Sequence, residues 1–324
     1  MAASSGPAPE VIADYTTFDF EALWPGREKV TRIEQCLLNQ LLSEVHCRRL
    51  LEIGTGFGRL TPALRALAGE YVGMDLDPTG LARARAAAGG RLDSSTRWAL
   101  ANLHHLPFAP GTFDAVVMVR LAHHLPRWEE TTRALAQLLC PGGRCVVTVF
   151  PSLTAGTLAE DVKAALREGS GHRWETFVRG EDVHVTDAPH PKYVGSRHGY
   201  RRALERSGLR ITVGLGSGLE ELIPWIPSED WVKVAYLGES SPLFPMKWYA
   251  ADRAGSREAP LCPLDAVFGC PRCGTELAGL VGMGEDGSDT CSKCGFEVRR
   301  SEGVTDLRYF AESTSRIGPR LTPG

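Results

Sequence analysis

The sequence lacks several features that would place it in a special class of protein. It has no run of about 18 consecutive apolar residues, the length that a helix needs to cross a bilayer. Its first residues carry no basic segment followed by an apolar one, as a secretory signal would. Lys and Arg (36) are balanced by Asp and Glu (39), so the net charge of −3 gives no general affinity for polyanions. We therefore expect a soluble, cytoplasmic protein with no membrane partner.

The composition is otherwise ordinary for a globular chain of 324 residues, with 43% hydrophobic and 23% charged residues. This length suits one large domain and a smaller one. The nine cysteines are unevenly spread: five are scattered, and four form two Cys-x-x-Cys pairs near the carboxyl end. In a chain without an export signal, such pairs favour a metal site over disulfides.

Strands and helices are expected to alternate along most of the chain. Apolar spacing predicts helices at 28–46, 60–67, 79–88, 128–139 and 198–207. Strands are expected at 49–53, 71–74, 98–100, 113–119, 144–150, 209–213 and 231–237, with Pro141-Gly-Gly143 as a turn before the fifth. This alternation predicts an α/β fold with a Rossmann-like, doubly wound and mostly parallel sheet of seven strands.

The expected organisation has five parts. They are a leader and aromatic lid (1–27), the α/β domain (28–250) with a cap insertion (151–196), a linker (251–262), a small β-rich domain (263–311) and a flexible tail (312–324). The cap, with a short helix near 157–167, follows the fifth strand and would face the ligand crevice of an open α/β sheet. The lid contains Tyr15, Phe18, Phe20 and Trp24, for which ordinary packing on the sheet is the alternative.

The first strand runs into the glycine turn Glu52-Ile-Gly-Thr-Gly-Phe-Gly58, where the backbone can bend sharply and approach a ligand. The Gly-x-Gly-x-x-Gly fingerprint of dinucleotide-binding proteins is absent, because Arg59 stands where its third glycine belongs. Asp75 lies 21 residues after Gly54 and ends the next strand, where a carboxylate can accept hydrogen bonds from both ribose hydroxyls of an adenosine. A ligand-free turn and a nicotinamide cofactor are the alternatives.

Elements in order over residues 48–150 resemble class I S-adenosylmethionine (SAM)-dependent methyltransferases, in particular the type-11 group. Besides the glycine turn they are Val72-Gly-Met-Asp-Leu-Asp-Pro78, Ala101-Asn-Leu-His-His-Leu-Pro-Phe108 with Gly111-Thr-Phe-Asp-Ala115, His123-His-Leu125 and Leu139-Cys-Pro-Gly-Gly143. The resemblance implies that SAM is the co-substrate. It also implies that the glycines meet the methionine part of SAM, Glu52 places its amino group, Asp75 holds the ribose and Asn102 borders the adenine. The residues expected to bind SAM are Glu52, Gly54, Thr55, Gly56, Asp75, Leu76, Asn102, Leu103 and Arg120.

Methyl transfer from a sulfonium requires alignment and exclusion of water, and a general base only if the acceptor loses a proton. The catalytic candidates are His123, His124 and Arg120, since a histidine pKa near about 6.5 suits a base at neutral pH. Alternatively, one histidine packs or caps the next helix, and Arg120 anchors an anionic group or pairs with a carboxylate. The family's Asn/Asp-Pro-Pro-Tyr/Phe motif is absent, which argues against adenine and glutamine-amide acceptors and leaves O-, C-, S- and other N-methylation open.

The pairs Cys270-Pro-Arg-Cys273 and Cys291-Ser-Lys-Cys294 are separated by 17 residues, and each is followed by a glycine that relieves crowding in a knuckle turn. Four thiolates predict a closed, tetrahedral, structural Zn²⁺ site rather than a redox pair. The segment 270–307 resembles the small zinc-ribbon activator subunit of certain tRNA, rRNA and release-factor methyltransferases, here acting in cis. The ribbon would cover an apolar edge of the large domain or help to recognise a substrate.

Three functions follow from these observations. The first is methyl transfer to a small-molecule acceptor, which the slight negative charge and the cap favour. The second is an RNA methyltransferase of tRNA type, with a basic stripe of Arg173, Arg179, Lys192, Arg197, Arg201, Arg202 and Arg206 as its support. The third is a SAM-binding scaffold without catalysis. The acceptor atom and the oligomeric state are left open.

Overall fold

The structure is a computed structural model, and it describes residues 11–13, 19–90, 94–152, 154, 184–185, 193–220, 222–256, 260–277, 286–311 and 315–317. Tyr15, Phe18, most of the cap at 151–196 and most of the tail after 312 lie outside the described residues, as do Arg173, Arg179 and Lys192. In the part described, no helix is both long and apolar enough to cross a membrane.

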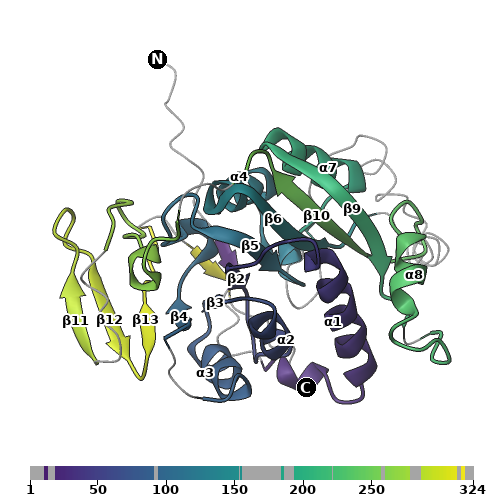
Figure 1. Cartoon of the computed structure of the whole chain (residues 1–324), viewed down its shortest axis with the longest axis horizontal. Helices are drawn as coiled ribbons and strands as arrows, with labels where there is room; N and C mark the ends of the chain where they lie inside the picture. Colours follow the sequence, from purple (N-terminus) through teal and green to yellow (C-terminus); the bar gives the residue numbers. More distant parts are fainter. Residues whose placement is uncertain are drawn as a thin grey trace.

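A ten-stranded sheet organises the described residues, in the order β11-β12-β13-β4-β3-β2-β5-β6-β10-β9 (Figure 1). Its strands are β2 (Arg49–Ile53), β3 (Glu70–Asp75), β4 (Thr96–Leu100), β5 (Phe113–Met118), β6 (Leu139–Val149), β9 (Leu209–Ser217), β10 (Met246–Arg253), β11 (Gly287–Thr290), β12 (Glu297–Ser301) and β13 (Val304–Asp306). The five strands from β4 to β6 are parallel, and β10 is antiparallel to β6 and β9. The expected doubly wound, mostly parallel sheet is therefore confirmed.

Helices cover both faces of this sheet. They are α1 (Glu28–Leu42), α2 (Thr61–Ala66), α3 (Pro78–Ala87), α4 (Trp128–Leu138), α7 (Arg197–Arg206) and α8 (Trp231–Tyr236). In Figure 1, α4 and α7 lie on one side of the sheet, and α1, α2 and α3 lie on the other. Two short strand pairs stand apart from the sheet: β1 (Val11–Ala13) with β14 (Ser315–Ile317), and β7 (His184–Val185) with β8 (Tyr193–Val194).

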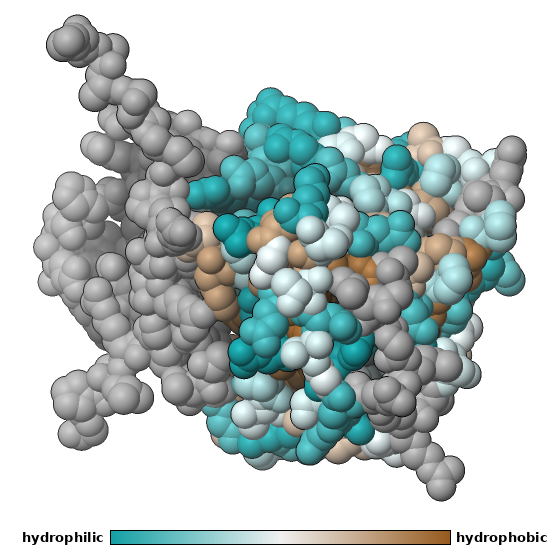
Figure 2. All heavy atoms as spheres, turned by 90° about the vertical axis from the view of Figure 1, so that its left-hand side faces the viewer, coloured by the Kyte–Doolittle hydropathy of each residue, from teal (hydrophilic) through white to brown (hydrophobic). Residues whose placement is uncertain are grey.

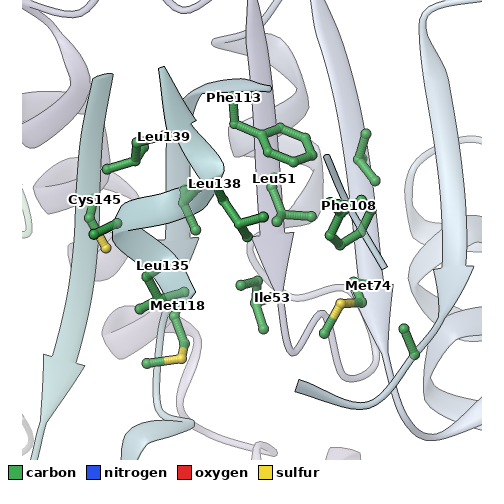
Figure 3. Close-up of a cluster of buried hydrophobic side chains, with 14 of the residues drawn as sticks. Leu51, Ile53, Met74, Phe108, Phe113, Met118, Leu135, Leu138, Leu139 and Cys145 are labelled. Carbon is green, nitrogen blue, oxygen red and sulfur yellow. The ribbon is translucent and has the colours of Figure 1, made fainter. Parts of the chain in front are cut away.

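Each face of the sheet has its own buried hydrophobic cluster. On the α4 and α7 side, Leu51 and Ile53 of β2 and Met118 of β5 lie near Leu135 and Leu138 of α4 (Figure 3). On the opposite side the apolar stripes of α1, α2, α3 and α8 pack on the alternate strand residues. Because the central strands are covered on both faces, β2 and β5 are buried along their whole length, as parallel strands of this kind require.

Three predictions of secondary structure are wrong in part. The strand expected at 231–237 is wrong: Trp231–Tyr236 form the helix α8, with Trp231 and Ala235 buried one turn apart against β9 and α1. The seventh strand of the α/β sheet is instead β10, whose last three residues, 251–253, fall in the expected linker. The Pro141-Gly-Gly143 turn lies inside β6, where a register shift against β5 between Phe113 and Ala115 accommodates it.

The carboxyl-terminal strands β11, β12 and β13 continue the large sheet and do not form a sheet of their own. β13 pairs in parallel with β4, aligning Val304 with Trp98 and Asp306 with Leu100. Phe268 packs against Phe108 with ring centroids 5.7 Å apart, and both belong to the cluster on the α4 face. The outer side of this region is mainly hydrophilic with small hydrophobic areas (Figure 2). β13 thus covers the edge of β4, while the division into domains remains a prediction.

Candidate functional site

A crevice of about 450 Å³ opens at the carboxyl ends of β2, β3, β4 and β5. All the residues predicted to bind SAM or to act in catalysis line it. The crevice is lined, among others, by Glu52, Gly54, Thr55, Gly56, Asp75, Leu76, Asn102, Leu103, Arg120, His123 and His124. Such convergence at the carboxyl edge of a parallel sheet is where open α/β folds bind ligands. The roles of the individual residues stay predictions.

The glycine turn and Asp75 are joined by hydrogen bonds. Gly54 and Gly56 have φ of +77° and +52°, conformations that favour glycine. The Gly56 N–H donates to Asp75 Oδ2 at 2.7 Å, and the Asp77 N–H donates to Asp75 Oδ1 at 2.9 Å. Burial raises the pKa of Asp75, and these two N–H groups oppose the rise. Each carboxylate oxygen keeps a second lone pair, which a ribose hydroxyl could use.

Glu52 is buried at the base of the crevice, where Oε2 accepts hydrogen bonds from the hydroxyls of Tyr71 (2.5 Å) and Thr61 (2.8 Å). Burial raises the pKa of Glu52 to about 7, although both hydroxyls favour the ionised form. The side chain therefore holds its proton far more readily than an exposed glutamate. Its two hydroxyl partners fix its position, so it offers a firmly placed acceptor to a cationic ligand group.

Asn102 lies two residues after the end of β4, beside the expected adenine position. Its Oδ1 accepts from the His104 N–H at 3.0 Å, which caps the 3₁₀ turn Leu103–His105. Its Nδ2 donates to the carbonyl of Tyr309 at 3.2 Å, and the Tyr309 ring lies 4.9 Å from that of His105. The segment that follows β13 thus reaches the residues bordering the crevice, a contact that sequence reasoning did not anticipate.

Arg120 pairs with a carboxylate, which was one of the alternatives considered for it. Its Nη2 lies 2.7 Å from Glu34 Oε1, and its Nε donates to the same oxygen at 2.8 Å. Its backbone has φ of +56° and its N–H donates to the hydroxyl of Thr148 at 2.6 Å. A left-handed conformation at a non-glycine residue costs free energy and is often found at functional sites.

The two histidines also line the crevice, side by side in the 3₁₀ turn Ala122–His124 after β5. Their ring centroids are 3.9 Å apart. His123 meets Phe150 edge-on at 4.9 Å, and His124 lies 6.3 Å from Phe20. Aromatic rings and imidazoles thus lie together in a crevice that the carboxylates of Glu52 and Asp75 also line.

Sequence reasoning missed two of the charged groups at the crevice. Arg59 lines it and lies over the ring of Trp24, with Cζ 3.9 Å from the ring centroid. Glu34, which is completely buried on α1, lies 2.5 Å from Arg59 Nη2. The only signal for Arg59 was that it replaces the third glycine of the dinucleotide fingerprint. Glu34 falls within the apolar stripe of α1, where a buried carboxylate requires a partner.

The four paired cysteines form a compact cluster. All four Sγ atoms lie within 4.8 Å of one another, with Cys270 and Cys294 3.5 Å apart and Cys273 and Cys291 3.7 Å apart. A tetrahedral zinc ion with Zn–S bonds of about 2.3 Å needs sulfur atoms about 3.8 Å from one another, so the donor set fits. The two knuckles also match: the N–H groups of Gly274 and Gly295 donate to the carbonyls of the first cysteine of each pair.

Comparison with known proteins agrees with this geometry. Residues 51–147 match the family of methyltransferase domains. The demethylmenaquinone methyltransferase of Thermus thermophilus is 39% identical over 106 residues, covering 32% of this chain and 48% of that protein. The ubiquinone biosynthesis O-methyltransferase of Xanthomonas campestris is 28% identical over 42% of this chain and 58% of that protein. The chain spans about half the length of the curated relatives that it matches.

The fold also has solved counterparts. A Listeria monocytogenes protein assigned as an S-adenosylmethionine-dependent methyltransferase aligns with a TM-score of 0.51 and 14% identity, over 71% of this chain and all of that one. At this identity the likeness shows the fold alone. Together with the match over residues 51–147, it shows that the strands carrying the crevice belong to a region similar to methyltransferase domains.

Proposed function

We propose that the chain transfers a methyl group from SAM to an O, N or C atom of a small-molecule acceptor. The observation that carries this proposal is that two unlike groups of residues line one crevice. Asp75, Glu52 and the glycine turn make up one group, and His123, His124 and Phe150 make up the other. The first group suits an adenosine with an amino-acid arm, and the second suits a compact apolar acceptor.

SAM, when bound, supplies a methyl group made reactive by the neighbouring sulfonium. The chain's own residues then align and shield the reaction. Asp75 would hold the ribose hydroxyls, and Glu52 would place the amino group. The rings of Phe20 and Phe150 would exclude water from the acceptor. If the acceptor is a hydroxyl or a protonated amine, an imidazole nitrogen of His123 or His124 would take the proton that it loses.

The charged surface gives less support to an RNA acceptor. Of the basic stripe, Arg197 and Arg201 both pair with Glu239 at 3.0 Å, and Arg206 pairs with Glu129 at 2.9 Å. Arginines already held by carboxylates contribute less to the binding of phosphates, which depends on replacing counterions along the backbone. RNA methylation and a scaffold without catalysis therefore stand as the alternatives for the experiment to separate.

The test is incubation with SAM labelled on its methyl group, in parallel with small-molecule extract, with bulk tRNA and with no acceptor. The proposal expects label in the small-molecule fraction and release of S-adenosylhomocysteine, with Asp75→Ala as the inactive control. Label confined to tRNA would favour the RNA alternative. Binding of S-adenosylhomocysteine with no label in either fraction would favour the scaffold.

We further propose that the cysteine cluster holds one structural Zn²⁺, with no coordination position left for catalysis. Its support is that the four sulfur atoms lie within 4.8 Å of one another, close enough to share one ion. Metal analysis should give about one zinc per chain, falling to near zero in Cys291→Ser and staying unchanged in Cys36→Ser, a substitution on α1 outside the cluster. Zinc content that does not respond to Cys291→Ser would contradict the assignment.

A further inference from the structure

The segment between β9 and β10 exposes an unusual number of apolar side chains. Among the described residues, six large apolar side chains are exposed, and five of them fall within 222–243. This apolar patch comprises Leu222, Trp225, Tyr236, Leu237 and Leu243. Figure 1 shows α8, which ends at Tyr236, at the opposite end of the molecule from β11, β12 and β13. A gathering of exposed apolar residues in one segment marks a surface for interaction.

A buried lysine fixes the backbone under one half of the apolar patch. Lys247 is 2% exposed, and its Nζ donates to the carbonyls of Gly238 and Ser241 at 2.6 Å and 2.5 Å. Gly238 directly follows Leu237, and Ser241 lies two residues before Leu243. The two leucines are therefore exposed by a backbone that is held in place, and not by a loop that is free to turn them inward.

A second lysine holds the other half and connects it with the crevice. Nζ of Lys29, on α1, donates to the carbonyl of Pro224 at 2.6 Å, and Pro224 lies between Leu222 and Trp225 in the chain. Arg27, two residues before Lys29, lines the crevice. The start of α1 thus contacts the apolar patch and the crevice at once, so a partner bound to the patch would lie beside the crevice.

The shape and the size of the patch favour a lipid bilayer as its partner. Four of the five side chains are 59–77% exposed, so they project from the surface and do not line a groove that could hold one ligand chain. A stable interface with a protein buries about 800 Å² from about 20–30 residues on each side, far more than five side chains supply. Insertion at the boundary of headgroups and acyl chains needs only a few Trp, Tyr and Leu side chains.

The charges around the patch are compatible with lipid phosphate groups. Near the start of α1 and around α8, the charged side chains that are not buried are Arg27, Glu28, Lys29, Arg32, Glu229, Asp230 and Lys233. Four cations against three anions leave a small positive excess, which suits anionic headgroups and does not repel zwitterionic ones. Lys233 is already paired with Asp230 at 3.0 Å, so attraction to the bilayer should come mainly from the apolar side chains.

We propose that the apolar patch docks on the surface of a lipid bilayer, with Trp225, Leu237 and the neighbouring leucines inserted among the headgroups. Docking would place the crevice next to the membrane and give it access to molecules dissolved there. The inference is independent of the proposed function, because binding to lipid requires no methyl transfer. The expectation of no membrane partner rested on the lack of a spanning segment, which surface docking does not need.

The test measures binding of the full chain to vesicles by co-sedimentation. One set of vesicles is phosphatidylcholine, and the other is equal parts of phosphatidylcholine and phosphatidylglycerol. Trp225→Ser and Leu237→Ser should each weaken binding to both sets about tenfold or more, since each removes an apolar side chain that would leave water. Both side chains are exposed, so both variants should fold as the wild type does. Ala86→Ser, an exposed substitution on α3, is the control and should bind as the wild type does.

Fluorescence quenching tests insertion directly. Vesicles of phosphatidylcholine that is brominated along its acyl chains should quench the fluorescence of the wild-type chain. The quenching should fall sharply in Trp225→Phe, which keeps an aromatic ring and should bind to the vesicles within about threefold of wild type. Quenching of the same size in Trp225→Phe would show that Trp225 does not enter the bilayer and would overturn the proposed docking.

Three other results would also overturn it. They are no binding of the wild-type chain to either set of vesicles, equal binding by the wild type and both serine variants, and a dimer without lipid that Leu237→Ser dissociates in sedimentation velocity. The last result would assign the patch to a second copy of the chain. S-adenosylhomocysteine should bind all variants equally. If it binds none of them while vesicle binding persists, the proposed function fails and the docking surface stands.

Discussion

Two glycines of the turn after β2 should respond in opposite ways to the same substitution. Gly58 has φ of +87°, and a Cβ built on it would lie 2.4 Å from Ala84 Cα and 3.1 Å from Ala84 Cβ, in α3. Gly56 has φ of +52°, and a Cβ there would meet no atom within 4 Å. Gly56 lines the crevice, and we expect the open space beside it to lie on the side of the ligand.

The magnitudes follow from these contacts. Alanine in the left-handed region costs about 1–2 kcal/mol, and its smaller unfolded-state entropy offsets about 0.4–1 kcal/mol of this. Gly58→Ala adds the overlap with the backbone of α3, an overpacking cost of about 1–3 kcal/mol. We expect Gly58→Ala to lose about 2–4 kcal/mol of unfolding free energy and Gly56→Ala about 1 kcal/mol or less. Each kcal/mol shifts the melting temperature by about 2–4 °C, so the melting temperatures of the two variants should differ clearly.

Ligand binding should show the reverse order. Gly56→Ala should weaken binding of S-adenosylhomocysteine at least tenfold, because its methyl group enters the ligand space beside Asp75. Folded Gly58→Ala should bind within about threefold of wild type. Thermal unfolding and calorimetry on both variants provide the comparison. If Gly58→Ala is as stable as Gly56→Ala, the close approach of α3 is wrong; if Gly56→Ala binds as wild type does, the ligand does not lie against the turn.

Two further predictions concern a buried amide and a buried acid. Asn102→Asp should lower the free energy of unfolding at pH 7.5 by about 1–3 kcal/mol, because a carboxylate cannot donate to the carbonyl of Tyr309. In the same urea unfolding assay Asn102→Ser, which keeps a donor, should lose less. Equal stability of Asn102→Asp and wild type would refute the hydrogen bond. Burial raises the pKa of Glu52 from an ordinary 4.5 to about 7, so the folded state binds the Glu52 proton more tightly than the unfolded state does. The folded state therefore loses stability as the pH rises from about 4.5 to 7. Glu52→Gln should flatten the stability–pH profile in that window, and a decline as steep as that of wild type would show that another group titrates there.

The glycine turn, Asp75 and the histidine pair could be predicted because each is a short motif fixed to the end of a strand. Parallel strands bring their carboxyl ends to one edge, so predicting the strands was enough to bring these residues together. The ion pairs of Arg59 and Arg120 with Glu34 could not be found in this way. Glu34 comes from α1, and only the packing of that helix against the sheet determines these contacts.

The errors in secondary structure also have a physical cause. The β-branched and aromatic residues of 231–237 favour a strand locally, yet docking against α1 and β9 selects a short helix. β10 shows no alternation, since its first six residues are buried between β6 and β9. Lys247 also makes β10 hard to recognise as a buried strand, because a lysine is expected at the surface. Its side chain is 2% exposed, and Nζ donates to the carbonyls of Gly238 and Ser241. A buried lysine with main-chain acceptors has no signature in a sequence.

The pairing of β13 with β4 gives the cysteine cluster an influence on the crevice that needs no direct contact. Without β13, one edge of β4 would expose unpaired backbone N–H and C=O groups. The pairing extends one residue past β13, because the Leu307 N–H donates to the carbonyl of Leu100 at 2.8 Å. Asn102 lies two residues farther along the chain and holds Tyr309. Because β12 and β13 are hydrogen-bonded neighbours beside the cysteine knuckles, loosening the knuckles removes the partner of β4. The strand β4 and the cysteine cluster should therefore unfold as one cooperative unit.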